Sequence, residues 1–206
     1  MSSDYNFYLS NCPMLFEKKG VITVQKILEE LQFMTCKIHF TALSSVHAIQ
    51  QIKQLKRHKM NARDRVSCEI AAHQLFFQSH DIREGNTKFK CLATIRDQAE
   101  RELLQIAYKR GNYDCVTSFH FPVHPKYKFE VDRNFFKAMN GMSALGFTLQ
   151  AMWTMYKQKQ QVFAFDQKTD KEAEDVFMRN FVTTHCSRPA EILGIDSFKG
   201  SIQVGK

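Results

Sequence analysis

The sequence predicts an α/β fold in which parallel strands alternate with crossover helices. Three short runs, 37–43, 66–70 and 113–118, have the composition of strands, and segments with helical spacing of apolar residues separate them. Polar and ring-bearing side chains gather directly after the last run, in 119–125. The carboxyl ends of strands are where α/β folds build their sites. With 206 residues, 44% of them hydrophobic, the chain is long enough for one sizeable core, and we expect a single domain over residues 1–206.

The N-terminal half is expected to begin irregularly and then alternate. Residues 4–17 show no clear period, and Pro13 acts as a breaker. Apolar residues recur at helical spacing in 21–33, and a strand follows at 37–43. Ser44 or Ser45 is placed to cap the next helix, whose apolar positions run from Val46 to Leu55. A second strand is predicted at 66–70.

The C-terminal half continues the same order. A polar loop precedes a helix at 97–110, which Gly111 closes, and the third strand is predicted at 113–118. A helix is expected over 135–156, interrupted near its start by Gly141 and Gly146, and another over 171–186 that ends before Pro189. Residues 200–204, GSIQV, are predicted to form a short C-terminal strand.

Composition narrows the classes of protein. No run approaches the ~18 apolar residues that a membrane span needs, and the N-terminus does not resemble a signal peptide. The six cysteines are scattered without a C-x-x-C motif, which favours free thiols in a reducing compartment, and we expect a cytoplasmic protein. The net charge is +8, and the densest basic run is 53–65. That run is better interpreted as solvated surface than as a nucleic-acid site, because aromatic interleaving and a known module are missing.

Several segments carry a resemblance to a known family. HDIREGNTKFKCLATIRDQAERELLQIAYKRGNYDCVTSFHFPVHPKYK, DRNFFKAMNGMSALGFTLQAMWT and RNFVTTHCSRPAEILGIDSFKGSIQVGK are similar to the allantoinase branch of the cyclic amidohydrolases. KIHFTALSS and VSCEIAAHQLFF resemble the two barrel strands that precede them in dihydroorotases, dihydropyrimidinases and allantoinases. The similarity is collinear from about Tyr8 to Lys206, and the order and spacing of the motifs make it specific.

The resemblance implies the C-terminal part of a (β/α)8 TIM barrel with a binuclear zinc centre. In the family, an H-x-H pair, a carboxylated lysine, two later histidines and an aspartate hold the metals. A bridging hydroxide attacks the ring amide of allantoin, a step of purine degradation, and the aspartate moves the proton. Two cations would lower the pKa of the bridging water and polarise the carbonyl. The H-x-H pair, the lysine and the first of the later histidines have no counterpart in this sequence.

The two ligand positions that do have counterparts carry the wrong side chains. The family's H-x-x-H-L-S strand is His39-Phe40-Thr41-Ala42-Leu43-Ser44 here, so Ala42 stands at a zinc-ligand position. The S-D-H-S-P motif is Ser118-Phe119-His120-Phe121-Pro122, so Phe119 replaces the aspartate. The S-R-P-P-E segment reads as residues 11–15, which suggests that its arginine and its acid are lost. We therefore expect no catalytic residue, no metal ligand and no cofactor.

His73, His120 and Ser44 remain as candidate rim or vestigial substrate-binding residues, although a structural role is the simpler interpretation of each. His120 and His124 have the i, i+4 spacing of a metal pair, but Pro122 between them argues against a helix. His39 is expected to be a hydrogen-bonded histidine of the interior, and Glu69 a buried acid that meets a donor.

The predicted function is that of an allantoinase-like pseudoenzyme, catalytically inactive, which acts by binding or as a scaffold. One alternative is a cyclic-amide hydrolase that is active only when a partner chain supplies the metal half. Another is a basic nucleic-acid-binding module, which rests on charge alone. A closed barrel needs about eight strands and ~250 residues. The three predicted strands would leave open edges, so we expect a homo-oligomer or a complex that covers them.

Overall fold

The computed structural model of the chain describes residues 2–31, 37–58, 65–158 and 170–206. Within these ranges it contains one sheet of three parallel strands in the order β1-β2-β3, which are Ile38–Leu43, Val66–Ala71 and Cys115–Thr117. The α/β class with parallel strands is confirmed. The register pairs Ile38 with Val66 and Ile70 with Val116, and it shifts between Phe40 and Leu43. That irregularity lies at the carboxyl end of β1, where the site is expected.

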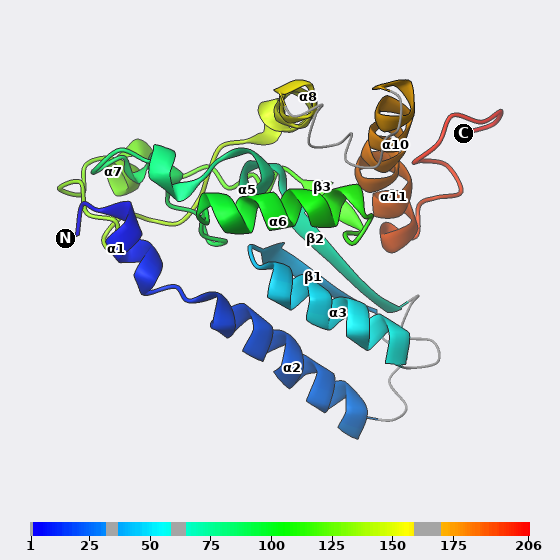
Figure 1. Ribbon diagram of the computed structural model, residues 1–206, viewed down its shortest axis with the longest axis horizontal. Coiled ribbons are helices and arrows are strands. Elements are labelled where there is room, and N and C mark those ends of the chain that lie inside the picture. The colour runs from blue at the N-terminus through cyan, green and yellow to red at the C-terminus, as the bar shows by residue number, and fades with distance from the viewer. Residues whose placement is uncertain (1, 32–36, 59–64, 159–169) are drawn as a thin grey trace.

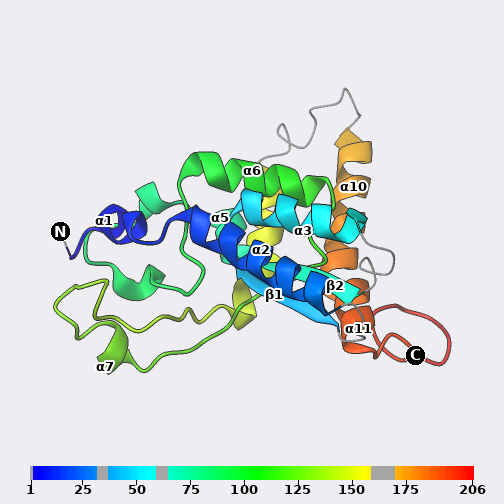
Figure 2. The same cartoon turned by 90° about the horizontal axis from the view of Figure 1, so that it is seen from below.

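Two crossover helices cover one face of the sheet. Helix α3 (Val46–His58) joins β1 to β2, and α6 (Gln98–Lys109) leads into β3. Figures 1 and 2 show both helices on the same side of the strands. Buried residues of β2 form one core with those helices, namely Val66, Cys68 and Ile70 with Ile49, Ile52 and Leu104. Because side chains alternate along a strand, the opposite face carries the polar residues of the sheet.

The N-terminal segment differs from the prediction. Residues 4–17 were expected to be irregular, but they contain helix α1 (Tyr5–Ser10) and the start of α2 (Met14–Glu30). Pro13 occupies the position before the first residue of α2, where its fixed φ suits a helix start, so it begins a helix instead of breaking one. Residues 32 and 33, the end of the helix predicted over 21–33, lie outside the described residues.

Helix α1 belongs to a second, smaller core. Its members are Tyr5, Tyr8, Ile82, Cys91, Ile95 and Phe135. The rings of Tyr5 and Phe135 meet edge to face with centroids 5.2 Å apart. Short helical segments surround this core: α5 (Ala72–Phe76), η1 (Ser79–Asp81), η2 (Thr87–Phe89) and α7 (Pro125–Lys128). Together these segments frame the region beyond the carboxyl ends of the strands.

The C-terminal part contains η3 (Leu145–Phe147), α8 (Thr148–Gln158), α10 (Asp170–Val182), a π-helical stretch η4 (Thr183–Ser187) and α11 (Arg188–Leu193). The helix predicted over 135–156 therefore begins only at Thr148. The helix predicted to end before Pro189 instead continues through η4 into α11, because proline is tolerated in a first helical turn. Stacked rings of Tyr156 and Phe177, 4.2 Å apart, hold α8 against α10.

The predicted C-terminal strand Gly200–Val204 is wrong. These residues form bends and a turn, and Ile202 and Val204 are fully exposed. A strand needs a hydrogen-bonding neighbour, and the three described strands pair only with one another. The two chain ends lie at opposite ends of the long axis (Figures 1 and 2). Across the described ranges, no helix is both long enough and apolar enough to cross a membrane.

Candidate functional site at the carboxyl ends of the strands

The backbone is unusual at both positions where the sequence indicated lost ligands. Ala42 has φ 55° and Phe119 has φ 44°, which is the left-handed region. In the described residues only two other non-glycine residues, Asp132 and Arg133, share this conformation. A left-handed backbone costs an ordinary L-residue roughly 1–2 kcal/mol, and such strain concentrates at functional sites. The strand ends therefore keep a specialised geometry, although the side chains that they present are a methyl group and a phenyl ring.

The residues at these strand ends do not fit a zinc centre. Zinc in proteins is held by thiolate, imidazole or carboxylate groups, and neither Ala42 nor Phe119 offers any of them. Among the residues that the structure describes, no three histidine, cysteine, aspartate or glutamate side chains come together as a metal-holding group. The expectation that no metal is bound is not decided by this geometry and stays a prediction.

His120 organises the loop beside the exit of β3. Its Nδ1 accepts hydrogen bonds from the backbone N–H groups of Ala144 and Leu145, at 3.0 and 3.1 Å. A parallel bridge joins His120 to Met142, and the N–H of Phe121 donates to the Met142 carbonyl at 3.0 Å. This imidazole therefore fixes the segment that runs back past the strand end. A rim or vestigial substrate-binding role for His120 stays a prediction.

The candidate pair of His120 and His124 is not assembled as a metal site. His124 stands before the first residue of α7, and its Nδ1 accepts from the N–H of Lys126 at 3.3 Å. Each histidine thus uses Nδ1 to satisfy backbone N–H groups of a different loop, as capping side chains do. The sequence-based argument that Pro122 prevents a helical pair agrees with this arrangement.

His73 is the most isolated of the three candidates. It lies in the first turn of α5, is 5% exposed, and neither ring nitrogen has a hydrogen-bond partner among the described residues. Burial lowers the pKa of His73 to about 4, because desolvation disfavours the charged imidazolium. The ring is therefore neutral at pH 7, with one donor and one acceptor nitrogen. His73 lines a pocket together with Ala144, whose backbone N–H donates to His120.

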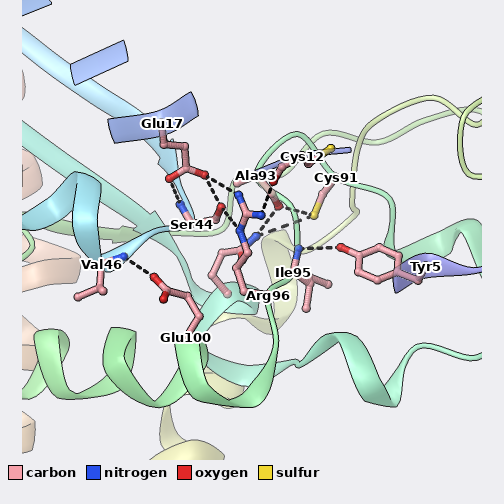
Figure 3. A network of polar contacts seen from close by, with 11 residues as sticks. Tyr5, Cys12, Glu17, Ser44, Val46, Cys91, Ala93, Ile95, Arg96 and Glu100 are labelled. Atoms are coloured by element: carbon pink, nitrogen blue, oxygen red, sulfur yellow. Dashed lines mark hydrogen bonds and ion pairs between the residues drawn. The ribbon is translucent and has the colours of Figure 1, made fainter. Parts of the chain in front are cut away.

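Ser44 lies at the centre of a buried network (Figure 3). Its backbone N–H donates to Glu17 Oε2 at 2.9 Å, and its hydroxyl also meets the Glu17 carboxylate. The Arg96 guanidinium donates to Ser44 Oγ at 3.0 Å, to Glu17 Oε1 at 3.2 Å and to the Cys12 carbonyl at 2.5 Å. Ser44 is completely buried, so its hydroxyl is engaged by the protein. A role for Ser44 toward a ligand stays a prediction.

Glu17 was missed in the sequence. The acid of its segment seemed lost at position 15, but two residues later Glu17 places a carboxylate on Ser44 and Arg96. The partners lie 27 and 79 residues away in the chain, so no local pattern connects them. A buried guanidinium needs such a counter-charge, and the signal in the sequence was Arg96, which directly follows the mostly apolar run CLATI.

The expected serine cap of α3 is replaced by a distant carboxylate. Ser45 Oγ is buried without a partner among the described residues, and Glu100 Oε1 accepts the N–H of Val46 at 2.5 Å instead. A negative group at the N-terminus of a helix is favourable, because unpaired N–H groups point toward it there. Desolvation raises the pKa of Glu100, and the Val46 N–H opposes that shift. Figure 3 shows Glu100 beside the Arg96 network.

The polar face of the sheet holds a connected chain of side chains. His39 Nδ1 lies 2.7 Å from Ser67 Oγ, and His39 Nε2 lies 3.1 Å from Glu69 Oε2. The predictions of a hydrogen-bonded His39 and a satisfied Glu69 are confirmed, and each is the other's partner. Thr41 on the same face is exposed, so this face is more accessible to solvent than the face that the helices cover.

Two lysines of the basic run contact residues directly before β3, at the other end of the sheet. Lys53 Nζ donates to Asn112 Oδ1 at 2.6 Å, and Lys56 pairs with Asp114. Arg188 donates to the same carboxylate at 2.9 Å. The pKa of Asp114 is lowered: burial alone would raise it, but Lys56, Arg188 and the N–H of Cys68 together prevail. Residues 59–64 of the basic run lie outside the described residues.

A lysine that the sequence did not single out anchors the loop after β3. Lys128 is buried, and its ammonium donates to the carbonyls of Lys90, Met139 (3.0 Å) and Gly141 (2.7 Å). Burial lowers the pKa of Lys128 to about 8. Gly141 has φ 146° and lies so close to Phe121 that a side chain would clash with the backbone. These contacts explain why residues 135–144 form a fitted loop in place of the predicted helix.

The amino-acid sequence is similar to those of allantoinases over almost its whole length. The chain is 30% identical to an allantoinase of Arabidopsis thaliana over 207 aligned positions, which cover 98% of this chain and 37% of that protein. It is 27% identical to an allantoinase of Streptomyces avermitilis, over 98% of this chain and 40% of that protein. The chain thus spans somewhat more than a third of the length of these relatives. No protein-family model matches it.

Solved structures agree on the fold. An L-hydantoinase (dihydropyrimidinase) from Arthrobacter aurescens superimposes with a TM-score of 0.81 at 20% identity, covering 99% of this chain and 41% of that one. A dihydroorotase from Saccharomyces cerevisiae superimposes with a TM-score of 0.63 at 17% identity, covering 88% and 44%. Similarity at this level of identity shows a shared fold, and it covers only part of each neighbour.

Proposed function

Because this chain belongs to the cyclic amidohydrolase superfamily and is homologous to its allantoinases, we propose that it is a non-catalytic member that acts by binding or as a scaffold. The observation that carries the proposal is the pair of strand ends at Ala42 and Phe119. Both positions have the left-handed backbone of a specialised site, and neither has a side chain able to bind a metal or move a proton.

The chemistry explains why these two changes matter. The family reaction that the resemblance implies, hydrolysis of the cyclic amide of allantoin, needs an activated water and a proton acceptor. Phe119 stands where both a metal ligand and that acceptor are expected, so one substitution removes two functions. Loss of a general base alone typically costs 10²–10⁴-fold in rate.

Metal analysis together with a hydrolysis assay tests the proposal. The purified chain is expected to contain far less than one zinc per chain after exposure to zinc and dialysis, and to hydrolyse no allantoin above the rate without protein. The His80→Ala variant is a matched control, since His80 is an exposed histidine and is not one of the candidate site residues. About two zinc ions per chain, with hydrolysis lost in His120→Ala and retained in His80→Ala, would overturn the proposal.

A second function is favoured by the coverage of the relatives and by the sheet. The chain matches 37–41% of the allantoinase and hydantoinase chains, and β1 and β3 are edge strands of the described sheet. Exposed parallel edges invite pairing. A partner chain that supplies the missing strands would then complete a barrel, and we propose a homo-oligomer or complex on the same grounds.

Complementation separates the two functions. The double variant Ala42→His with Phe119→Asp restores the two side-chain types, and it should be co-expressed with the part of the Arabidopsis allantoinase that this chain does not match. Gain of zinc and of allantoin hydrolysis by the wild-type chain together with this part supports the complemented enzyme. Gain in the double variant alone shows that Ala42 and Phe119 abolish the activity of a completed barrel, which supports the non-catalytic proposal. No gain supports the scaffold. A monodisperse, cooperatively unfolding monomer in sedimentation experiments would contradict the expected association.

The remaining expectations are also part of the proposal. The described cysteines, which are residues 12, 68, 91, 115 and 186, are all free, which supports a reducing compartment such as the cytoplasm. Lys53 and Lys56 of the basic run already contact Asn112 and Asp114, which weakens the case for a nucleic-acid site. Binding of duplex DNA that falls steeply with salt would reverse that judgement.

A further inference from the structure

A pocket of about 440 Å³ lies between α5, α8 and the segments 88–89 and 142–147, and neither Ala42 nor Phe119 lines it. Four aromatic side chains contribute to its lining: Phe76, Phe77, Phe89 and Phe147. Phe77 meets both Phe76 and Phe89 edge to face, with centroids 5.1 Å apart in each pair. Interlocked rings of this kind form a rigid apolar wall, and the volume is within the range of small-molecule sites, roughly 300–1,000 Å³.

His73 lines this pocket, and of the lining residues it is the one whose buried side-chain polar atoms have no hydrogen-bond partner among the described residues. Buried side-chain polar atoms are nearly always hydrogen-bonded, and an unsatisfied one is unfavourable. Here two atoms of one ring lack partners among the described residues, although the ring is only 5% exposed. The imidazole is neutral at pH 7, so its unprotonated nitrogen is an unpaired acceptor in the lining of a pocket whose other residues are largely apolar.

The charges around the pocket limit what it can hold. Among the described residues, Lys88 is the charged residue of its lining, and none of the lining residues is acidic. A cationic ligand would find no counter-charge and would meet a like charge at Lys88. A neutral ring system that donates one hydrogen bond pairs the acceptor nitrogen of His73 and packs its apolar faces against the phenylalanine rings.

We propose that this pocket binds a small neutral aromatic heterocycle of two or three fused rings, with a ring N–H that donates to His73. His120 supports the site from outside, because it holds Ala144, a lining residue, through the backbone. The site does not involve Ala42 or Phe119, so it stands whether or not the strand ends are catalytic.

Indole and benzofuran form a matched pair of probes, because benzofuran has the same shape without the N–H donor. Each is titrated into the 206-residue chain while the methyl signal of Met142, a lining residue, is followed by ¹³C NMR. We expect saturable binding of indole with a Kd on the order of 0.1–1 mM. Benzofuran should bind about tenfold or more weakly, because it leaves His73 unpaired.

Variants locate the binding. Ala151→Phe fills the pocket from α8 and should abolish the Met142 shift for both probes, whereas Leu149→Phe, on the same helix outside the lining, should leave it unchanged. His73→Phe should lower the affinity for indole to that for benzofuran. If that variant does not fold, the comparison of the two probes and Ala151→Phe still decides. Equal affinities for the two probes in the wild-type chain, or unchanged binding in Ala151→Phe, would overturn the proposal.

Discussion

Replacing Ala42 by glycine measures how much strain the end of β1 holds. Ala42 is partly buried and has φ 55°, a conformation that glycine adopts without a steric penalty. Relief of the left-handed strain should contribute roughly 1–2 kcal/mol to the free energy of unfolding. Loss of a half-buried methyl group and the greater freedom of glycine in the unfolded chain oppose it by about 1 kcal/mol together. The expected net effect is a stabilisation of about 0.5 kcal/mol.

Ala151→Gly provides the control, because Ala151 is also partly buried but lies inside α8. Both substitutions change the unfolded chain in the same way, so their difference reports the folded backbone. Glycine inside a helix costs about 1 kcal/mol, so the two variants should differ by about 1.5 kcal/mol and in opposite directions. Urea unfolding followed by circular dichroism at one protein concentration measures both. If Ala42→Gly destabilises the chain as much as Ala151→Gly does, the strand end holds no strain.

Three further outcomes follow from the same contacts. Phe119→Asp should change the free energy of unfolding by no more than about 1 kcal/mol, because the ring is only half-buried and aspartate tolerates a left-handed backbone. The variant should also hydrolyse no allantoin. Urea unfolding measures the first result and the hydrolysis assay the second. The pKa of His73 is lowered to about 4 in the folded chain, so neutral His73 contributes to the free energy of unfolding. That contribution is fully present above pH 6.5 and is lost as the pH falls toward 4, by up to about 3 kcal/mol. The His73→Leu variant should lack this part of the pH dependence of unfolding. Arg96→Met should destabilise the chain by roughly 3 kcal/mol, since it leaves the Glu17 carboxylate without its cation. In urea unfolding, the double variant Arg96→Met with Glu17→Gln should lose less stability than the sum of the losses in the two single variants, which would demonstrate that the two residues are coupled.

The strands and the central helices were predictable because local signals determine them. β1 and β2 are apolar runs of strand length, and the expected helix 97–110 appears as α6, with Asp97 accepting the N–H of Glu100 at 2.9 Å. In β1, β2 and α6 the apolar pattern agrees with the tertiary structure, and in α6 the cap does as well. The expected single domain over residues 1–206 is not decided by these elements and stays a prediction.

The errors arose where contacts distant in sequence override the local pattern. Tyr5–Ser10 forms α1 because Tyr5 packs on Phe135 and its hydroxyl accepts the N–H of Ile95 at 2.8 Å, 90 residues away. Residues 135–144 avoid a helix because Lys128 binds carbonyls there. The predicted strand 200–204 had alternating residues but no neighbouring strand to pair with. A one-dimensional period cannot report such partners.

The candidate site was predictable in position but not in conformation. The sequence located the two strand ends and the substituted side chains, and the backbone angles explain what those substitutions left behind. Histidine and aspartate are among the residues most often found at positive φ, whereas alanine and phenylalanine suit it poorly. The resemblance implies histidine at position 42 and aspartate at position 119, the two types that this backbone accommodates. Ala42 and Phe119 therefore occupy a frame shaped for other side chains, and the surrounding contacts, such as His120 on Ala144 and Glu17 on Ser44, hold that frame in place. Restoring the chemistry at these positions should consequently cost the fold little, which is why the double variant is a test of function and not of folding.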